Sequence, residues 1–206
     1  MAISLVTIGQ KITAYIVNLI IAAVNLQGSA GVVPTSVAGT GVTVSSSGKV
    51  SFSAATSVSI NGVFTSTYDT YEVEFVYTTT AAAATTVRLR ASGTDSTGSV
   101  YDRQRLSGIA TAASAASSLA QTSWGLTEAI IGRQTIRLTL ENPAAAAATT
   151  GVGVVGSVAN PMAGTSGVSL VMVQHQTSSA YDGITLTIAS GSITGYARVR
   201  GINTQA

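Results

Sequence analysis

The chain has 206 residues, and only 9% of them are charged, against about 25% in an ordinary soluble domain. Its ten basic and eight acidic residues include no run of Lys or Arg, so the sequence does not indicate a nucleic-acid-binding protein. Cysteine is absent and histidine occurs once, which excludes disulfides and the usual zinc sites, and we expect no metal and no cofactor.

The first patterned segment is residues 11–31, KITAYIVNLIIAAVNLQGSAG, the most apolar stretch of the chain. Read as a helix, it has apolar residues at alternating spacings of four and three, which form the seam of a heptad. Further apolar residues beside the seam make the surface too wide for two-stranded pairing, so a three-fold bundle or burial against another protein is favoured. The candidate oligomerisation or docking residues are Ile12, Ile16, Leu19, Ile20, Ala23 and Leu26.

Two alternatives exist for this segment. As a membrane span it is short, because about 15 helical residues cover about 22 Å of the roughly 30 Å hydrocarbon core. Asn18 and Asn25 would also lack partners in lipid. As a signal peptide it has Lys11 before the apolar run and Ala30 among small residues after it, but the basic region comes unusually late. We therefore expect a protein-covered helix and no membrane span.

Residues 28–48 are rich in Gly, Ser and Thr and contain Pro34, which disfavours both a helix and a central strand. The sequence thus predicts three parts: a helical anchor or oligomerisation segment at 1–27, an extended linker at 28–48, and a β-sandwich domain at 49–206.

The rest of the chain consists of short alternating runs separated by turn residues, with no helical period between them. This pattern predicts an all-β fold, an antiparallel and jelly-roll-like β-sandwich. The predicted strands are 42–46, 49–53, 56–60, 70–78, 86–91, 134–141, 151–158, 167–176, 183–189 and 196–201.

Alternation is clearest in residues 70–78, TYEVEFVYT, where the aromatic and aliphatic side chains share one face and the glutamates lie on the other. If this strand forms a hairpin with the next one, Glu74 lies opposite Arg88 and Glu72 opposite Arg90. Such exposed pairs would mainly fix the register of the two strands.

Three alanine clusters, at 81–84, 112–120 and 144–148, favour helix by intrinsic propensity alone. They lie among Ser and Thr and lack an amphipathic period, so we expect loops or tight subunit contacts. The segment 112–120, AASAASSLA, is interpreted as either a loop or one short helix.

No catalytic constellation is visible in the sequence, and we expect a protein that is not an enzyme. His175, the only imidazole, falls at a predicted strand end and is expected at the surface or an interface. Asp95, Asp102 and Asp182 lie in predicted loops, where hydrogen bonding within turns is favoured over paired-carboxylate chemistry. Trp124, the sole tryptophan, would offer a host-glycan contact if exposed and a core residue otherwise.

Several segments, in order along nearly the whole chain, resemble small structural proteins of tailed bacteriophages, often described as minor tail or tail-fibre-like proteins. They are TIGQKITAYIVNLIIAAVN, TSVSINGVFTSTYDTYEVEF, VRLRASGTDSTGSVYDRQRL and YDGITLTIASGSITGYARVRG. The resemblance implies an N-terminal helix and linker attached to the particle, a projecting β-rich body that is often trimeric, and no catalytic residues.

The leading hypothesis is therefore a homotrimeric virion protein of the tail, which contacts other phage proteins and assists host attachment. Attachment would include contact with a host cell-surface glycan. A head-decoration or capsid-fibre protein would need the same anchor and the same β body. A glycan-depolymerising enzyme is a less favoured alternative. A secreted bacterial surface protein is a further one, and it requires cleavage of the first 30 residues.

Overall fold

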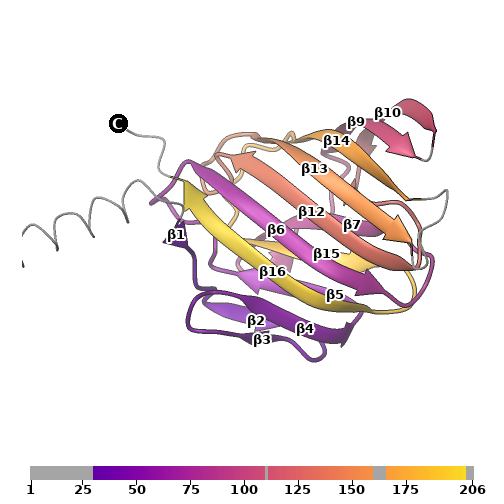
Figure 1. Ribbon diagram of the computed structural model, residues 1–206. Coiled ribbons are helices and arrows are strands. Elements are labelled where there is room, and N and C mark those ends of the chain that lie inside the picture. The colour runs from indigo at the N-terminus through magenta and orange to yellow at the C-terminus, as the bar shows by residue number, and fades with distance from the viewer. Residues whose placement is uncertain (1–29, 110, 160–165, 203–206) are drawn as a thin grey trace, which may run out of the picture.

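The computed structural model describes residues 30–109, 111–159 and 166–202, and this part of the chain contains strands and no helix (Figure 1). The strands form two antiparallel sheets of ten and six strands. The larger sheet contains β1 (Ala30–Gly31), β3 (Thr43–Val44), β4 (Val50–Ala55), β6 (Thr70–Thr79), β9 (Tyr101–Ile109), β10 (Ala112–Gln121), β12 (Gly132–Glu141), β13 (Thr149–Ala159), β14 (Gly167–His175) and β16 (Ile193–Ile202). The smaller sheet contains β2 (Ser36–Ala38), β5 (Ser57–Asn61), β7 (Thr85–Ala91), β8 (Thr94–Asp95), β11 (Trp124–Gly125) and β15 (Gly183–Ile188).

The larger sheet has the order β10-β9-β14-β13-β12-β6-β16-β4-β3, with β1 also paired to β16. The smaller sheet has the order β11-β7-β15-β5-β2, with β8 paired to β7, and it lies behind the larger one in Figure 1. The all-β, antiparallel prediction is confirmed.

One apolar core joins the two sheets. The larger sheet contributes alternate residues of β6 and β12, such as Phe75 and Leu138, and the smaller sheet contributes Leu89 and Leu186, all fully buried. Each such side chain stabilises the fold by about 1.5–3 kcal/mol relative to its exposed state. The alternation that the sequence shows in these strands arises because one side of each sheet faces this core.

The predicted hairpin between residues 70–78 and 86–91 is wrong. β6 pairs with β12 and β16 in the larger sheet, whereas β7 belongs to the smaller sheet. The Glu74 carboxylate accepts hydrogen bonds from Arg137 at 3.1 and 2.8 Å, and Glu72 pairs with Arg200 at 3.2 Å. The acidic face of β6 thus finds its arginines on β12 and β16, at much larger sequence separation.

Residues 112–120 form neither of the predicted structures, because β10 is a strand paired with β9. β9 itself was not predicted, and the reason is its inward face, which carries Arg103, Arg105 and Ser107 in place of apolar residues. The predicted loops at 81–84 and 144–148 are confirmed.

The described part of the predicted linker turns at Thr40 and Gly41 and contributes β1, β2 and β3 to the two sheets, so it is part of the β fold. The predicted N-terminal helix, with all six candidate docking residues, lies outside the described residues. No helix with the length and apolarity required to cross a bilayer occurs in the described ranges.

Candidate functional site

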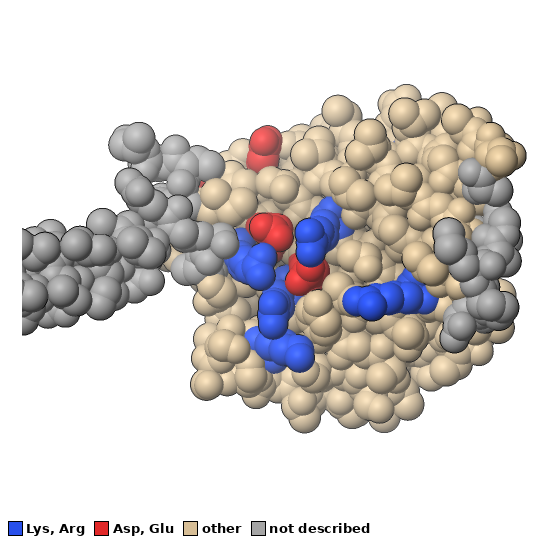
Figure 2. All heavy atoms as spheres, viewed as in Figure 1, with Lys and Arg blue, Asp and Glu red and all other residues tan. Residues whose placement is uncertain are grey.

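The outer side of the larger sheet is divided into an apolar half and a charged half. Residues directly opposite each other in antiparallel strands project to the same side, so the register gives the rows of this surface. One row runs from β9 across to β16 in the order Leu106, Leu170, Val154, Arg137, Glu74 and Arg198. Figure 2 shows the consequence: charged groups gather over β6, β12 and β16, and the surface over β13 and β14 carries none.

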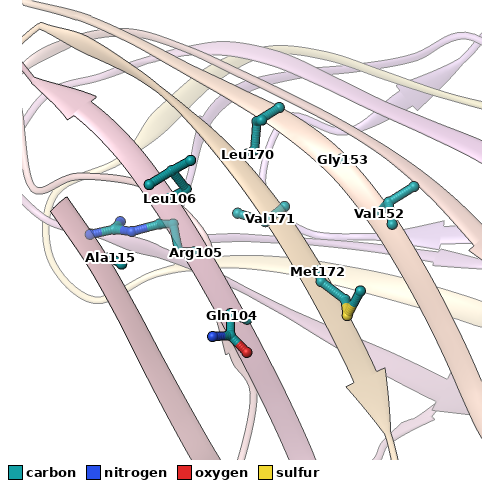
Figure 3. Close-up of a pocket in the computed structure, with 9 residues that line it drawn as sticks. All are labelled: Gln104, Arg105, Leu106, Ala115, Val152, Gly153, Leu170, Val171 and Met172. Atoms are coloured by element: carbon teal, nitrogen blue, oxygen red, sulfur yellow. The ribbon is translucent and has the colours of Figure 1, made fainter. Parts of the chain in front are cut away.

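The apolar half consists of aliphatic side chains from three adjacent strands, each between 45% and 61% exposed. We call this surface the apolar face, and its members are Leu106, Val152, Val154, Val158, Val168, Leu170 and Met172. Figure 3 shows Leu106 of β9, Leu170 and Met172 of β14 and Val152 of β13 along one stretch of these strands. They line a groove of about 460 Å³, and a second groove of about 260 Å³ adjoins it at Val152 and Met172.

The apolar face exists because β13 inverts the usual arrangement of a half-buried strand. Its valines at 152 and 154 point outward, while Gly151 and Gly153 point inward. A Cβ on Gly153 would lie 2.6 Å from Leu138 Cδ2, and one on Gly151 would lie 2.7 Å from Leu140 Cδ2. Leu138 and Leu140 of β12 therefore fill the core next to these glycines. The valines of β13 lie on the outer side of the sheet.

Beneath the apolar face the interior is partly polar, with buried serines beside the core valines Val155, Val171 and Val173. Ser169 of β14 and Ser107 of β9 are buried and share a hydrogen bond of 2.8 Å between their hydroxyls. The buried Ser157 hydroxyl donates to Gln134 Oε1 at 2.6 Å. Because these groups satisfy one another, the strands tolerate serine inside while leucine, methionine and valine lie outside.

The apolar face is large enough to be a docking surface. Its side chains together form a patch on the order of 600 Å², the upper end of the range for the largest patch on an ordinary monomer. Burying these side chains in an interface removes about half of the surface of each one from water. This stabilises the interface by roughly 1 kcal/mol per residue.

β10 extends this surface to the edge of the sheet. Its ten residues, AASAASSLAQ, include no charged residue and no proline, and all but Ser118 are exposed. Natural edge strands usually carry charged residues or proline, which prevent other strands from pairing with them. In β10 only an irregularity between Ser118 and Gln121, where Ala120 has a φ of 53°, interrupts the edge.

His175 is buried, so its expected surface position is wrong. Its ring packs edge-on between Tyr101 and Tyr181, and its Nε2 lies 3.0 Å from the Ser96 hydroxyl. This resembles a nucleophile and its base, but the ring is 0% exposed, and neither residue lines the cavities described here. Burial lowers the pKa of His175 and raises the pKa of Tyr101 to about 12, as expected for groups within a core.

The structure places Trp124 in the core at 1% exposure. Its ring meets Tyr101 edge-on at 5.2 Å, and its Nε1 donates to the Gln174 carbonyl at 3.0 Å. No face of the ring is presented to a glycan in this arrangement.

The predicted loop positions are wrong for Asp95 and Asp102, which lie in β8 and β9, and all three aspartates form hydrogen bonds or ion pairs within the fold. Asp95 pairs with Arg90, Asp102 accepts from the Ala120 amide at 2.8 Å, and Asp182 accepts from the Ser92 amide at 3.1 Å. Within the described ranges, no group of three or more His, Asp or Glu side chains is arranged to hold a metal ion.

The apolar face was not predicted from the sequence, although one signal for it was present. In GVGVVGSV, residues 151–158, glycine alternates with valine, and an inward glycine requires an outward valine. No family model matches this chain, and no curated protein matches it.

Proposed function

We propose that the chain is a non-enzymatic structural protein of a bacteriophage virion, a minor tail or tail-fibre-like component. Residues 1–27 form its helical anchor, and the β body, a jelly-roll-like sandwich, projects from the particle for host attachment. The observation that carries this proposal is the apolar face, which gives the β body a surface suited to permanent assembly.

The occupant of the apolar face is another copy of the same chain. The largest exposed aliphatic cluster of the described residues adjoins an uncharged edge strand, so the apolar face of one copy can contact the β10 edge of the next, the head-to-tail contact that closes a ring. A stable interface buries about 800 Å² per partner, and a patch on the order of 600 Å² together with β10 supplies most of it. The charged half of the sheet, with its ion pairs formed internally, stays in water.

Three copies are favoured over two because of the N-terminal segment. Its wide apolar surface, from Ile12 to Leu26, suits a three-stranded bundle. Once the bundle forms, the tethered β bodies experience one another at an effective concentration in the millimolar range. The contact that each apolar face makes with the next copy then closes the trimer.

A head-decoration or capsid-fibre protein is the alternative, because the same anchor and β body serve either place. Labelling intact phage particles with antibodies against the β body, followed by electron microscopy, distinguishes them. Label at the tail supports the proposal, and label over the head replaces it with the alternative. Particles that carry the gene product in neither place reject both.

A further inference from the structure

Arg103 is a half-buried guanidinium without an acidic partner. It lies on the inward side of β9, opposite Val173 of β14, where a sandwich strand usually carries an apolar residue. Its neighbour on the same side, Arg105, pairs with Glu128 at 2.6 Å. No carboxylate of the described residues lies within ion-pair distance of Arg103.

The hydrogen bonds of Arg103 are also incomplete. One terminal nitrogen, Nη2, donates to the Ser118 hydroxyl at 3.0 Å, whereas the buried Nε has no acceptor among the described atoms. Burial, with a further contribution from the nearby Arg105, lowers the pKa of Arg103, and the negative charge of Glu128 only partly opposes them. The surroundings therefore leave this positive charge under-compensated, and an anion beside it would be stabilised.

A cavity of about 190 Å³ lies beside this guanidinium, at the edge of the smaller sheet where β11 meets β9 and β10. Its lining offers hydroxyl and amide groups and no carboxylate. The residues are Thr86, Arg103, Ser118, Gln121, Ser123 and Gly125. The positive potential is increased by Arg88, whose Nε donates to the Thr122 carbonyl at 3.0 Å in the same turn.

We propose that this cavity binds the carboxylate of an acidic sugar unit, and that Arg103 is the residue that holds it. The planar guanidinium matches a carboxylate through parallel hydrogen bonds from its terminal nitrogens, because the Nε itself is buried. This inference goes beyond assembly through the apolar face and gives the host-attachment role a ligand class.

The lining favours a sugar acid over a phosphate ion. Serine and threonine hydroxyls and the Gln121 amide both donate and accept hydrogen bonds, and sugar hydroxyls also do both. The cavity is smaller than the 300 Å³ or more of sites for drug-sized ligands, which suits one terminal sugar and not an extended chain. Trp124 lies next to Gly125 in sequence but stays in the core, so the site works without ring stacking.

Isothermal titration of the full-length chain with D-glucuronate tests the proposal. We expect saturable binding in the millimolar range that weakens at least about tenfold in Arg103→Gln. D-glucose, which lacks the charge, and acetate, which lacks the ring hydroxyls, should each bind more weakly than glucuronate. Arg133→Gln, which removes an exposed arginine from the outer face of β12, is the matched control and should leave binding unchanged.

Equal glucuronate binding by native protein and Arg103→Gln would overturn the proposal, as would no binding by the native chain. Inorganic phosphate binding as tightly as glucuronate would show a general anion site and would also overturn it. If Arg103→Gln does not fold, Ser123→Ala provides a second test and should weaken glucuronate several-fold. Assembly through the apolar face is independent of this site, so the mass of the particle-free protein separates failure of this inference from failure of the proposed function.

Discussion

Leu138 of β12 occupies the space that a side chain on Gly153 of β13 would need. A Cβ on Gly153 would lie 2.6 Å from Leu138 Cδ2 and 2.2 Å from the Arg137 carbonyl oxygen. This contact holds β13 in the orientation that directs its valines outward, and the apolar face depends on it.

Replacing Gly153 with alanine should therefore destabilise the fold. Because the backbone oxygen cannot move aside cheaply, we expect a loss of about 1–3 kcal/mol in the free energy of unfolding. Gly156→Ala on the same strand is the control, since its Cβ would meet only Thr135 Cβ at 4.0 Å. Urea unfolding measures both variants, and equal losses would contradict the inward packing of Gly153.

The Glu74–Arg137 pair is expected to stabilise the charged half of the sheet. Glu74 is 5% exposed, and Arg137 provides two of its hydrogen bonds. Arg137→Gln should cost about 1 kcal/mol, at the lower end for a charged hydrogen bond because the arginine side chain is largely exposed. Arg133→Gln on the same strand should leave the free energy of unfolding unchanged. A similar loss of stability in both variants would show that removing any positive charge from β12 has this effect, and not the loss of the Glu74 pair.

Buried His175 should make stability depend on pH. Its pKa in the folded protein is lowered from 6.5 by burial, so the unfolded chain binds a proton that the folded chain does not. The free energy of unfolding should therefore fall as the pH decreases below about 6.5, by at most about 1.4 kcal/mol per pH unit. Urea titrations at pH 7.5, 6.5 and 5.5 measure this slope.

His175→Gln serves as the control for that experiment. The glutamine amide can keep the contact with Ser96, but it does not titrate. The free energy of unfolding of the variant should therefore change less over this pH interval. An unchanged slope would show that other groups cause the pH dependence.

Removing residues 1–27 should weaken assembly without unfolding the β body. The described core lies entirely in later residues, so the circular dichroism spectrum should keep its strand signal. We expect the shortened chain to dissociate at concentrations where the full chain stays associated. If both chains have the mass of one copy, the N-terminal segment docks onto another protein.

The sequence predicted those strands whose inward residues are apolar. In β6 and β12 the alternation of Phe75 or Leu138 with charged residues reflects burial against one core, and local pattern suffices. It did not predict β9 and β10, because Arg103, Arg105 and Ser107 occupy inward positions of β9 and β10 is almost entirely exposed, so neither strand carries an apolar period. The predicted hairpin between β6 and β7 failed because these two consecutive strands belong to different sheets.

The apolar face could not be predicted because outward and inward residues of a strand have the same period. Only the partner strand decides which set is buried, and here the β12 leucines fill the space over Gly151 and Gly153. A similar limit applies to Arg103: no carboxylate of the described residues forms an ion pair with it, and this depends on the folded chain and not on its neighbours in sequence.

The most direct test of assembly through the apolar face is the mass of the full-length protein in solution, measured by sedimentation equilibrium for the native chain and for Leu170→Glu. Leu170 is 57% exposed, so the change leaves the core intact while placing a charge at the centre of the face. Thr78→Glu, on the exposed outer side of β6 in the charged half, is the control. The account predicts three copies for the native chain and the control and weakened association for Leu170→Glu; equal masses for all three proteins, or one copy in the native chain, would contradict it.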